Sequence, residues 1–200
     1  MTCTQTTKLF LLLSLFIYIF STHKGELYDA GRSTLINLNP MNFNTQITNN
    51  RGKQIISFIH FYSPDDGKSD QLKDIFYELD KEYSGMFKLA GLNCKMYKDL
   101  CVKEGVSEYP AYYVYPPLPA PKMKYDGKLN TKHILGYLGS FISNKAVELN
   151  NNNFDEWYNS RPNIPKIILF SNKKNIPIIF KRLSLHFDVS KSNLLTNFLG

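Results

Sequence analysis

The sequence of 200 residues lacks any dense block of lysine and arginine, although its formal net charge is +7 and its pI is near 9.2. Scattered lysines usually form a solvated surface, so this charge does not indicate nucleic-acid binding, and none is expected. Hydrophobic residues make up 43% of the chain and aromatic residues 14%, which is enough for a packed core. We therefore expect one or two folded domains.

The first apolar run is too short for a membrane-spanning helix, which needs roughly 20 residues. Residues 9–20 read LFLLLSLFIYIF and follow the positive charge of Lys8. This length is typical of the hydrophobic region of a signal peptide, so residues 1–24 are predicted to direct the chain into the secretory pathway and then to be removed. The small-residue cleavage pattern is poor, which leaves an uncleaved anchor as the alternative. After removal, no stable membrane span is expected.

Cysteine is scarce, since the chain contains only Cys3, Cys94 and Cys101. Removal of the signal segment takes Cys3 away and leaves one pair. An even pair in an oxidising compartment indicates a disulfide, so Cys94 and Cys101 are predicted to form a structural bridge. A catalytic dithiol and two free thiols are the alternatives.

The pattern of apolar residues predicts alternating strands and helices between residues 25 and 145. Residues 54–62 (QIISFIHFY) are almost continuously apolar, as in a central strand buried on both faces, and residues 72–83 carry apolar side chains at helical spacing. Further strands are predicted at 34–38, 86–93, 111–115 and 122–125, and helices at 41–47, 96–103 and 134–142. Crossover helices require parallel pairing early in the sheet, with a hairpin near its end. This βαβαβαββα order is that of the α/β thioredoxin-like fold, a mixed sheet flanked by helices.

Residues 61–70 (FYSPDDGKSD) resemble the active-site stretch FYAPWCGHCK of the protein disulfide isomerase family. The family's two cysteine positions fall on Asp66 and Ser69. Other family positions match in register, namely Phe61, Tyr62, Pro64 and Gly67, the GV-x-x-YP element at Gly105, Val106, Tyr109 and Pro110, and the Y-x-G turn at Tyr125 and Gly127. The family's opening motif is similar to a set of residues in this chain, namely Leu27, Tyr28, Leu35, Ile36, Leu38, Asn42 and Phe43.

The second part of the chain resembles a redox-inactive domain of the same isomerases through residues 166–184 (KIILFSNKKNIPIIFKRLS). Residues 146–200 are therefore predicted to be a partial second thioredoxin-like domain, with strands at 147–149 and 166–170 and a helix at 154–158. Too little chain remains for a complete domain. Either the sequence is truncated or the half domain packs on the first domain.

The resemblance implies that the redox chemistry has been lost. Disulfide exchange needs a reactive thiolate and a second sulfur, whereas the motif positions carry Asp66, Gly67, Lys68 and Ser69. Asp66 can still cap the helix, but a carboxylate cannot attack a disulfide. No catalytic residue, cofactor or metal is expected.

Two accessory positions agree with this interpretation. The family's buried Glu and its partner Lys, which move protons for the thiols, correspond to His60 and Gly91. His60 is expected to be a core histidine that bonds to a backbone carbonyl, with a pH switch or ligand role as the alternative. No second ligand stands near it at a spacing that suits a metal.

The proline of the family that corresponds to Pro110 is cis and lies beside the active-site helix, so the resemblance implies peptide binding near Tyr62, Asp66, Tyr109 and Pro110. The alternative is that this proline serves only to shape the loop. The sequence thus predicts a redox-inactive relative of the isomerases that binds unfolded clients or another folding factor in the endoplasmic reticulum lumen or secretory pathway. The alternatives are an oxidoreductase that uses Cys94 and Cys101, and a purely structural adaptor.

Overall fold

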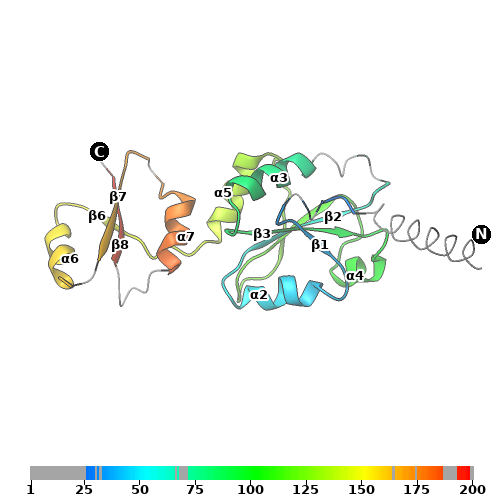
Figure 1. Cartoon of the computed structure of the whole chain (residues 1–200), viewed down its shortest axis with the longest axis horizontal. Coiled ribbons are helices and arrows are strands. Elements are labelled where there is room, and N and C mark those ends of the chain that lie inside the picture. Colours follow the sequence, from blue (N-terminus) through cyan, green and yellow to red (C-terminus); the bar gives the residue numbers. More distant parts are fainter. Residues whose placement is uncertain are drawn as a thin grey trace, which may run out of the picture. The chain divides into compact units, whose positions relative to one another are not determined.

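The computed structural model describes residues 26–29, 31, 33–65, 67, 72–163, 165–173, 175–186 and 193–198. The predicted signal segment lies outside these residues. Among the helices that are described, none is both long enough and apolar enough to cross a membrane. The chain divides into two compact units, of which the first ends at Ile134 and the second begins at Leu135 (Figure 1).

The first unit is built on a five-stranded mixed sheet. Its strands are β1 (Ile36–Leu38), β2 (Ser57–Tyr62), β3 (Lys88–Asn93), β4 (Ala111–Tyr115) and β5 (Met123–Lys124), in the spatial order β1-β3-β2-β4-β5. Both β1 and β2 pair with β3 in parallel, whereas β4 is antiparallel to β2 and to β5. The predicted parallel pairing followed by a hairpin is confirmed.

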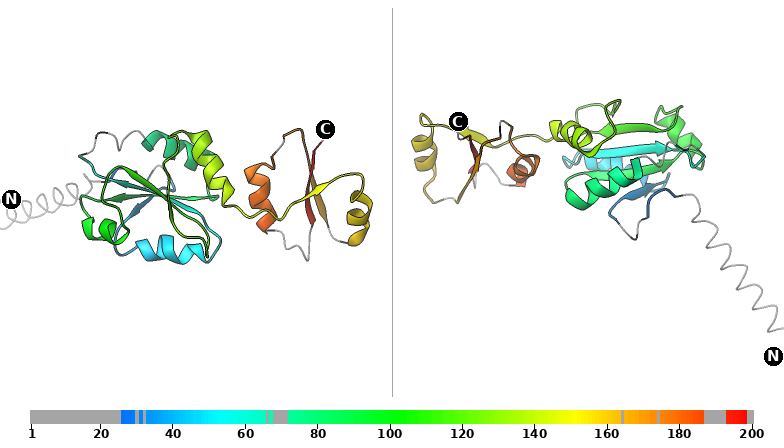
Figure 2. Two further views of the ribbon diagram at one scale, coloured as in Figure 1. Left: turned by 180° about the vertical axis from the view of Figure 1, so that it is seen from behind. Right: turned by 90° about the horizontal axis from the view of Figure 1, so that it is seen from above.

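Helices cover both faces of this sheet. They are the π-helix η1 (Asn44–Thr48), which continues into α2 (Asn49–Arg51), then α3 (Lys73–Glu82), α4 (Lys98–Lys103) and α5 (Thr131–Ser140). The views in Figures 1 and 2 place α3 on one face of the sheet and α2 and α4 on the other. The division between the two units falls inside α5.

The central strand β2 is buried along its whole length, as its apolar sequence predicts. Its side chains alternate between the two faces. Phe58 and His60 lie against Phe76 of α3, with ring centroids 5.4 and 6.2 Å apart, whereas Ile59 and Phe61 belong to the core cluster on the other face. Each large apolar side chain buried in this way contributes roughly 1.5–3 kcal/mol.

Strand β2 begins later than the sequence predicts, at Ser57 instead of Gln54. The cause is local, because the φ angle of Gln54 is 59°, in the left-handed region that a strand cannot use. Residues 52–54 form a turn after α2 instead.

The second unit contains a three-stranded parallel sheet. Its elements are β6 (Val147–Leu149), α6 (Phe154–Ser160), β7 (Lys166–Ser171), α7 (Ile178–His186) and β8 (Asn193–Phe198), with the strands in the order β6-β8-β7. The structure contains the predicted elements at 147–149, 154–158 and 166–170. It adds α7 and β8, for which the sequence analysis made no prediction.

A disulfide joins Cys94, directly after β3, to Cys101 in α4, with 5.8 Å between the two Cα atoms. The bridge lies inside the core cluster, since the two residues are 2% and 0% exposed. It therefore attaches α4 to the carboxyl end of the strand beside β2.

Replacing both cysteines by alanine should lower the free energy of unfolding by about 2–3 kcal/mol, because the bridge restricts a short loop of the unfolded chain. Urea denaturation of the purified protein measures the loss. The unsubstituted protein in a reducing buffer serves as the control and should lose a similar amount. A loss below about 0.5 kcal/mol would show that the bridge does not constrain the unfolded chain.

Candidate functional site

The candidate site lies in the loop between β2 and α3, where the sequence carries the altered motif. Of the four motif positions the structure describes only Gly67, which is exposed, while Asp66, Lys68 and Ser69 lie outside the described residues. Just before them, the carboxylate of Asp65 forms an ion pair with Lys95, in which Oδ2 of Asp65 and Nζ of Lys95 are 2.7 Å apart. Both side chains are more than half exposed, so the pair contributes little to stability.

The sheet brings Tyr62 and Pro110 together. Phe61 pairs with Ala111 in the β2–β4 ladder, so Pro110 stands just before β4 at the point where β2 ends with Tyr62. The Tyr109–Pro110 peptide bond is cis, and both residues are half-buried. This loop therefore lies beside the end of β2, from which the chain continues into the altered motif.

Tyr62 itself does not face solvent. It is 1% exposed, and its hydroxyl accepts a hydrogen bond of 2.9 Å from the backbone amide of Leu27. Burial raises the pKa of Tyr62 to about 12. Of the four residues predicted to bind a peptide, the structure thus leaves Tyr109 and Pro110 partly accessible, places Tyr62 in the core and does not describe Asp66.

The Cys94–Cys101 disulfide adjoins this site from the β3 side. The backbone amide of Cys94 donates a hydrogen bond of 2.8 Å to the carbonyl oxygen of Tyr62. Although the bridge is one residue beyond the strand, its sulfurs are enclosed by the core cluster. An attacking thiolate has to reach a sulfur atom, so the bridge is poorly placed for exchange.

Beneath the site, His60 is fully buried on the α3 face of β2. Its Nδ1 atom shares a hydrogen bond of 2.8 Å with the hydroxyl of Tyr28, and its buried Nε2 atom has no hydrogen-bond partner among the residues that the structure describes. The predicted backbone carbonyl partner is therefore wrong, because the Tyr28 hydroxyl fills that role. Burial lowers the pKa of His60 to about 3, so the imidazole is neutral at physiological pH.

Gly91 stands directly opposite His60 in the parallel β2–β3 pair. A Cβ atom on Gly91 would lie 2.5 Å from Cε2 of Tyr28 and 3.2 Å from Cε1 of Tyr62. The ring of Tyr28 therefore occupies the space where any larger residue at position 91 would begin. Tyr28, His60 and Gly91 form a neutral unit, which we call the Tyr28 plug, and its last two residues stand at the positions that the sequence analysis matches to the family's buried Glu and Lys.

The sequence analysis quoted Tyr28 only as part of an opening motif and assigned it no role in the site. The sequence does contain one indication of this role. A histidine and a glycine stand at positions 60 and 91, which we matched to the family's buried Glu and Lys, and the volume left free there has to be filled by another side chain.

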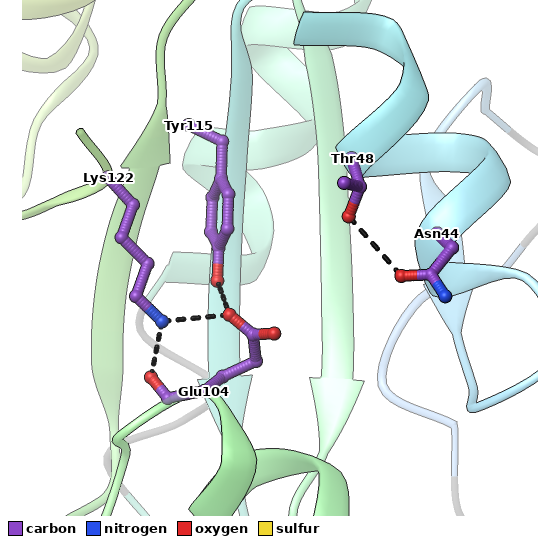
Figure 3. Close-up of polar contacts among 5 residues, drawn as sticks. All are labelled: Asn44, Thr48, Glu104, Tyr115 and Lys122. Atoms are coloured by element: carbon purple, nitrogen blue, oxygen red, sulfur yellow. Dashed lines mark hydrogen bonds and ion pairs between the residues drawn. The ribbon is translucent and has the colours of Figure 1, made fainter. Parts of the chain in front are cut away.

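A second polar cluster, which the sequence analysis missed, lies where α4 ends (Figure 3). The hydroxyl of Tyr115 donates to the Glu104 carboxylate at 2.7 Å, and Nζ of Lys122 donates to the same oxygen at 2.8 Å. Burial and this carboxylate raise the pKa of Tyr115 well above its usual value. The cluster ties the end of α4 to β4 and to the segment that leads into β5.

Glu104 also borders a pocket of about 370 Å³ between the start of η1 and α4. The other lining residues are Pro40, Phe43, Asn44, Asp99, Leu100 and Lys103. Figure 3 shows Asn44 and Thr48 beside this region, where the Thr48 hydroxyl donates to the Asn44 side chain at 3.4 Å. Among the residues that the structure describes, the lining contains no histidine, cysteine or serine.

Across the described residues, no group of three histidine, cysteine, aspartate or glutamate side chains is placed to hold a metal ion.

Comparison with known proteins identifies the chain's relatives. A family model described as Thioredoxin matches residues 34–140. The chain is 29% identical over 97 residues to DnaJ homolog subfamily C member 10 of Xenopus laevis, which covers 48% of this chain and 12% of that protein. It is 24% identical over 185 residues to a putative protein disulfide-isomerase of Dictyostelium discoideum, which covers 88% of this chain and 44% of that protein.

Among solved structures, the crystal structure of full-length ERdj5 is similar with a TM-score of 0.63 and 17% sequence identity, over 93% of this chain and 26% of that one. The chain thus spans less than half the length of both curated relatives named above. The predicted thioredoxin-like α/β fold and the resemblance to the protein disulfide isomerases are confirmed.

The close approach of Tyr28 to Gly91 predicts that Gly91→Ala destabilises the protein by about 1–3 kcal/mol, because the added methyl group overpacks the core. Gly136→Ala is the matched control, since a Cβ atom there meets nothing within 4 Å. Because Gly136 lies within α5, the control should stabilise the protein by about 0.5–1 kcal/mol. Urea denaturation measures both, and equal effects of the two substitutions would contradict the close packing.

Burial of neutral His60 predicts that stability falls when the pH drops below the unfolded-state pKa of 6.5. The folded-state pKa is the lower one, so the unfolded chain binds the extra proton, and the loss approaches about 1.4 kcal/mol per pH unit down to about pH 3. His60→Asn removes this titration. Urea denaturation at pH 7, 6 and 5 should show that the unsubstituted protein loses stability faster than the variant. Parallel losses would show that His60 takes up its proton in the folded protein.

Proposed function

The chain belongs to the thioredoxin family, and we propose that it is a redox-inactive relative of the protein disulfide isomerases that binds unfolded or partly folded polypeptides. We infer that it acts in the secretory pathway, in the lumen of the endoplasmic reticulum. In this proposal the thioredoxin-like unit is a binding module and performs no thiol chemistry.

One observation carries the proposal. The motif positions 66–69 contain no cysteine, and the two cysteines that remain after the signal segment form a bridge buried in the core. Exchange requires a thiolate that a substrate disulfide can reach, together with a second sulfur that resolves the mixed disulfide. The same burial weighs against an oxidoreductase that works through Cys94 and Cys101.

The Tyr28 plug supports the same conclusion. A proton relay needs ionisable groups whose charge can change near neutral pH. Here the imidazole of His60 stays neutral, because burial lowers its pKa to about 3, and Gly91 carries no side chain. These two buried positions therefore provide packing, and neither of them changes its charge near neutral pH.

Polypeptide binding is supported by the surface that Tyr109 and Pro110 form beside the end of β2. Tyr109 and Pro110 are both half-buried, at the end of the central strand, and aromatic and proline side chains of this kind suit contact with an extended chain. The compartment is supported by the signal-like residues 9–20, by a disulfide that oxidising surroundings favour, and by the similarity to ERdj5.

The proposal predicts that the purified protein does not reduce a fluorescent glutathione disulfide above the uncatalysed rate, and that the Cys94→Ala/Cys101→Ala variant behaves in the same way. It also predicts that the protein suppresses aggregation of a denatured client. Tyr109→Ser should weaken the suppression several-fold, whereas Tyr158→Ser, at a tyrosine 59% exposed in α6, should leave it unchanged.

Turnover that disappears in the double cysteine variant would overturn the proposal in favour of an oxidoreductase. Absence of both turnover and suppression would point to a structural adaptor. Urea denaturation of each tyrosine variant shows that a loss of suppression does not come from unfolding.

A further inference from the structure

The pocket of about 370 Å³ between the start of η1 and α4 lies in the first unit, and the proposed function does not involve it. We call it the η1–α4 pocket. Its lining combines apolar surface with polar and charged groups. The apolar residues are Pro40, Phe43 and Leu100, and the polar and charged residues are Asn44, Asp99, Lys103 and Glu104. A ligand that fills this pocket therefore needs both an apolar part and a polar part.

Glu104 offers this pocket an oriented acceptor. Within the described residues, the hydrogen bonds to its carboxylate all go to Oε2, from the Tyr115 hydroxyl at 2.7 Å and from Nζ of Lys122 at 2.8 Å. Figure 3 shows the other oxygen, Oε1, directed away from both donors and toward the side on which Asn44 lies. Because two donors hold the carboxylate in place, Oε1 is a fixed acceptor that a ligand with N–H groups can use.

The two walls of the pocket are also held in place. The Cys94–Cys101 bridge attaches α4 to the carboxyl end of β3. On the other wall, Oδ1 of Asn39 accepts hydrogen bonds from the backbone amides of Met41 at 2.9 Å and Asn42 at 3.0 Å. This turn leaves Met41 90% exposed, next in the chain to the lining residue Pro40. A ligand thus meets a preformed pocket, which lowers the entropy cost of binding.

The charges of the lining favour a cation. The described lining residues include two carboxylates, on Asp99 and Glu104, and one ammonium group, on Lys103. Lys122, which pairs with Oε2 of Glu104, is not among them. The side chain of Asp99 is exposed and forms no ion pair with another described residue, so its carboxylate is available to a ligand.

A basic amino-acid side chain has the required combination of properties. The alkyl stems of lysine and arginine pack on apolar surface while their charged ends reach polar groups. The guanidinium group of arginine carries five N–H donors in a planar fork, so it can donate to Glu104 and Asp99 together, whereas the ammonium group of lysine is a point charge. The pocket therefore suits arginine better than lysine.

We propose that the η1–α4 pocket binds an arginine side chain of a polypeptide partner. The stem of the arginine packs on Phe43 and Leu100, its guanidinium group donates to Glu104 and Asp99, and an apolar neighbour of the arginine contacts Met41. The choice of a polypeptide rests on the proposed function, whereas the preference for a guanidinium group rests on the pocket alone.

The test measures fluorescence anisotropy of a labelled short peptide in which one arginine stands between two leucines. A second peptide carries citrulline in place of arginine, which keeps the shape and removes the charge. Citrulline should weaken binding to the purified protein at least about tenfold, because its hydrogen bonds to the carboxylates are no longer charge-assisted. Lysine in the same place should weaken binding about threefold.

Three variants of the protein locate the site. Asp99→Asn should weaken binding of the arginine peptide about fivefold, whereas Asp155→Asn should change it less than about twofold. Asp155 is the matched control, because each of these exposed aspartates lies in the first turn of a short helix. Lys103→Gln should strengthen binding about twofold, since it removes a competing cation, and damage to the fold would have the opposite effect.

Four results would overturn the proposal. They are absence of binding of the arginine peptide, equal binding of the arginine and citrulline peptides, equal effects of Asp99→Asn and Asp155→Asn, and displacement of the peptide by an equal concentration of N-acetylarginine amide. The last result would assign the pocket to a small guanidinium compound.

Tyr109→Ser separates this proposal from the proposed function. Neither Tyr109 nor Pro110 is among the described residues that line the pocket, so the difference in affinity between the arginine and citrulline peptides should stay unchanged in this variant. Arginine-dependent binding without suppression of client aggregation would contradict the proposed function and leave the guanidinium site standing. Urea denaturation of each variant establishes that it is folded.

Discussion

Burial of β2 on both faces is the constraint on which the first unit depends. All six of its residues are buried, and helices pack on the sheet from both sides. A strand in this position must be apolar at successive residues, because each face of the sheet needs its own core. The packing of such a strand fixes the position of its last residue, Tyr62, and its pairing with β4 fixes the cis-proline segment that enters β4 beside it.

This dependence explains how the chain can keep the thioredoxin fold without the thiol chemistry of the disulfide isomerases, as we propose. The cysteines of the family's motif lie in the loop after β2, where they contribute to reaction more than to packing. Their replacement by Asp66 and Ser69 leaves the strand, its register with β3 and β4, and the two cores as the apolar sequence dictates. The buried Cys94–Cys101 bridge has the opposite character, since it packs in the core and is shielded from reaction partners.

The sequence predicts those parts of the fold that the spacing of apolar residues along the chain indicates. Residues 57–62 and 111–115 are strands because their β-branched and aromatic side chains are nearly continuous, and the spacing of the α3 residues identifies their helix. The left-handed Gln54 was not predictable, because a single φ angle depends on the turn around it. Nor was the contact of Tyr28 with His60 and Gly91, since it joins a residue before β1 to the middle of two later strands. Tertiary contacts of this kind leave no local periodicity in the sequence.

The Tyr28 plug has a consequence for the history of the chain. Two substitutions at positions 66 and 69 would restore the sulfurs, but the Lys of the family's buried pair cannot return to position 91 while the ring of Tyr28 lies 2.5 Å from the place of its first side-chain carbon. Return would require Tyr28 to leave first, which would open a void beneath His60 and cost stability before any activity was regained. Under the proposed function, the plug therefore opposes the recovery of a buried lysine at position 91 and of the redox chemistry that such a lysine serves in the family.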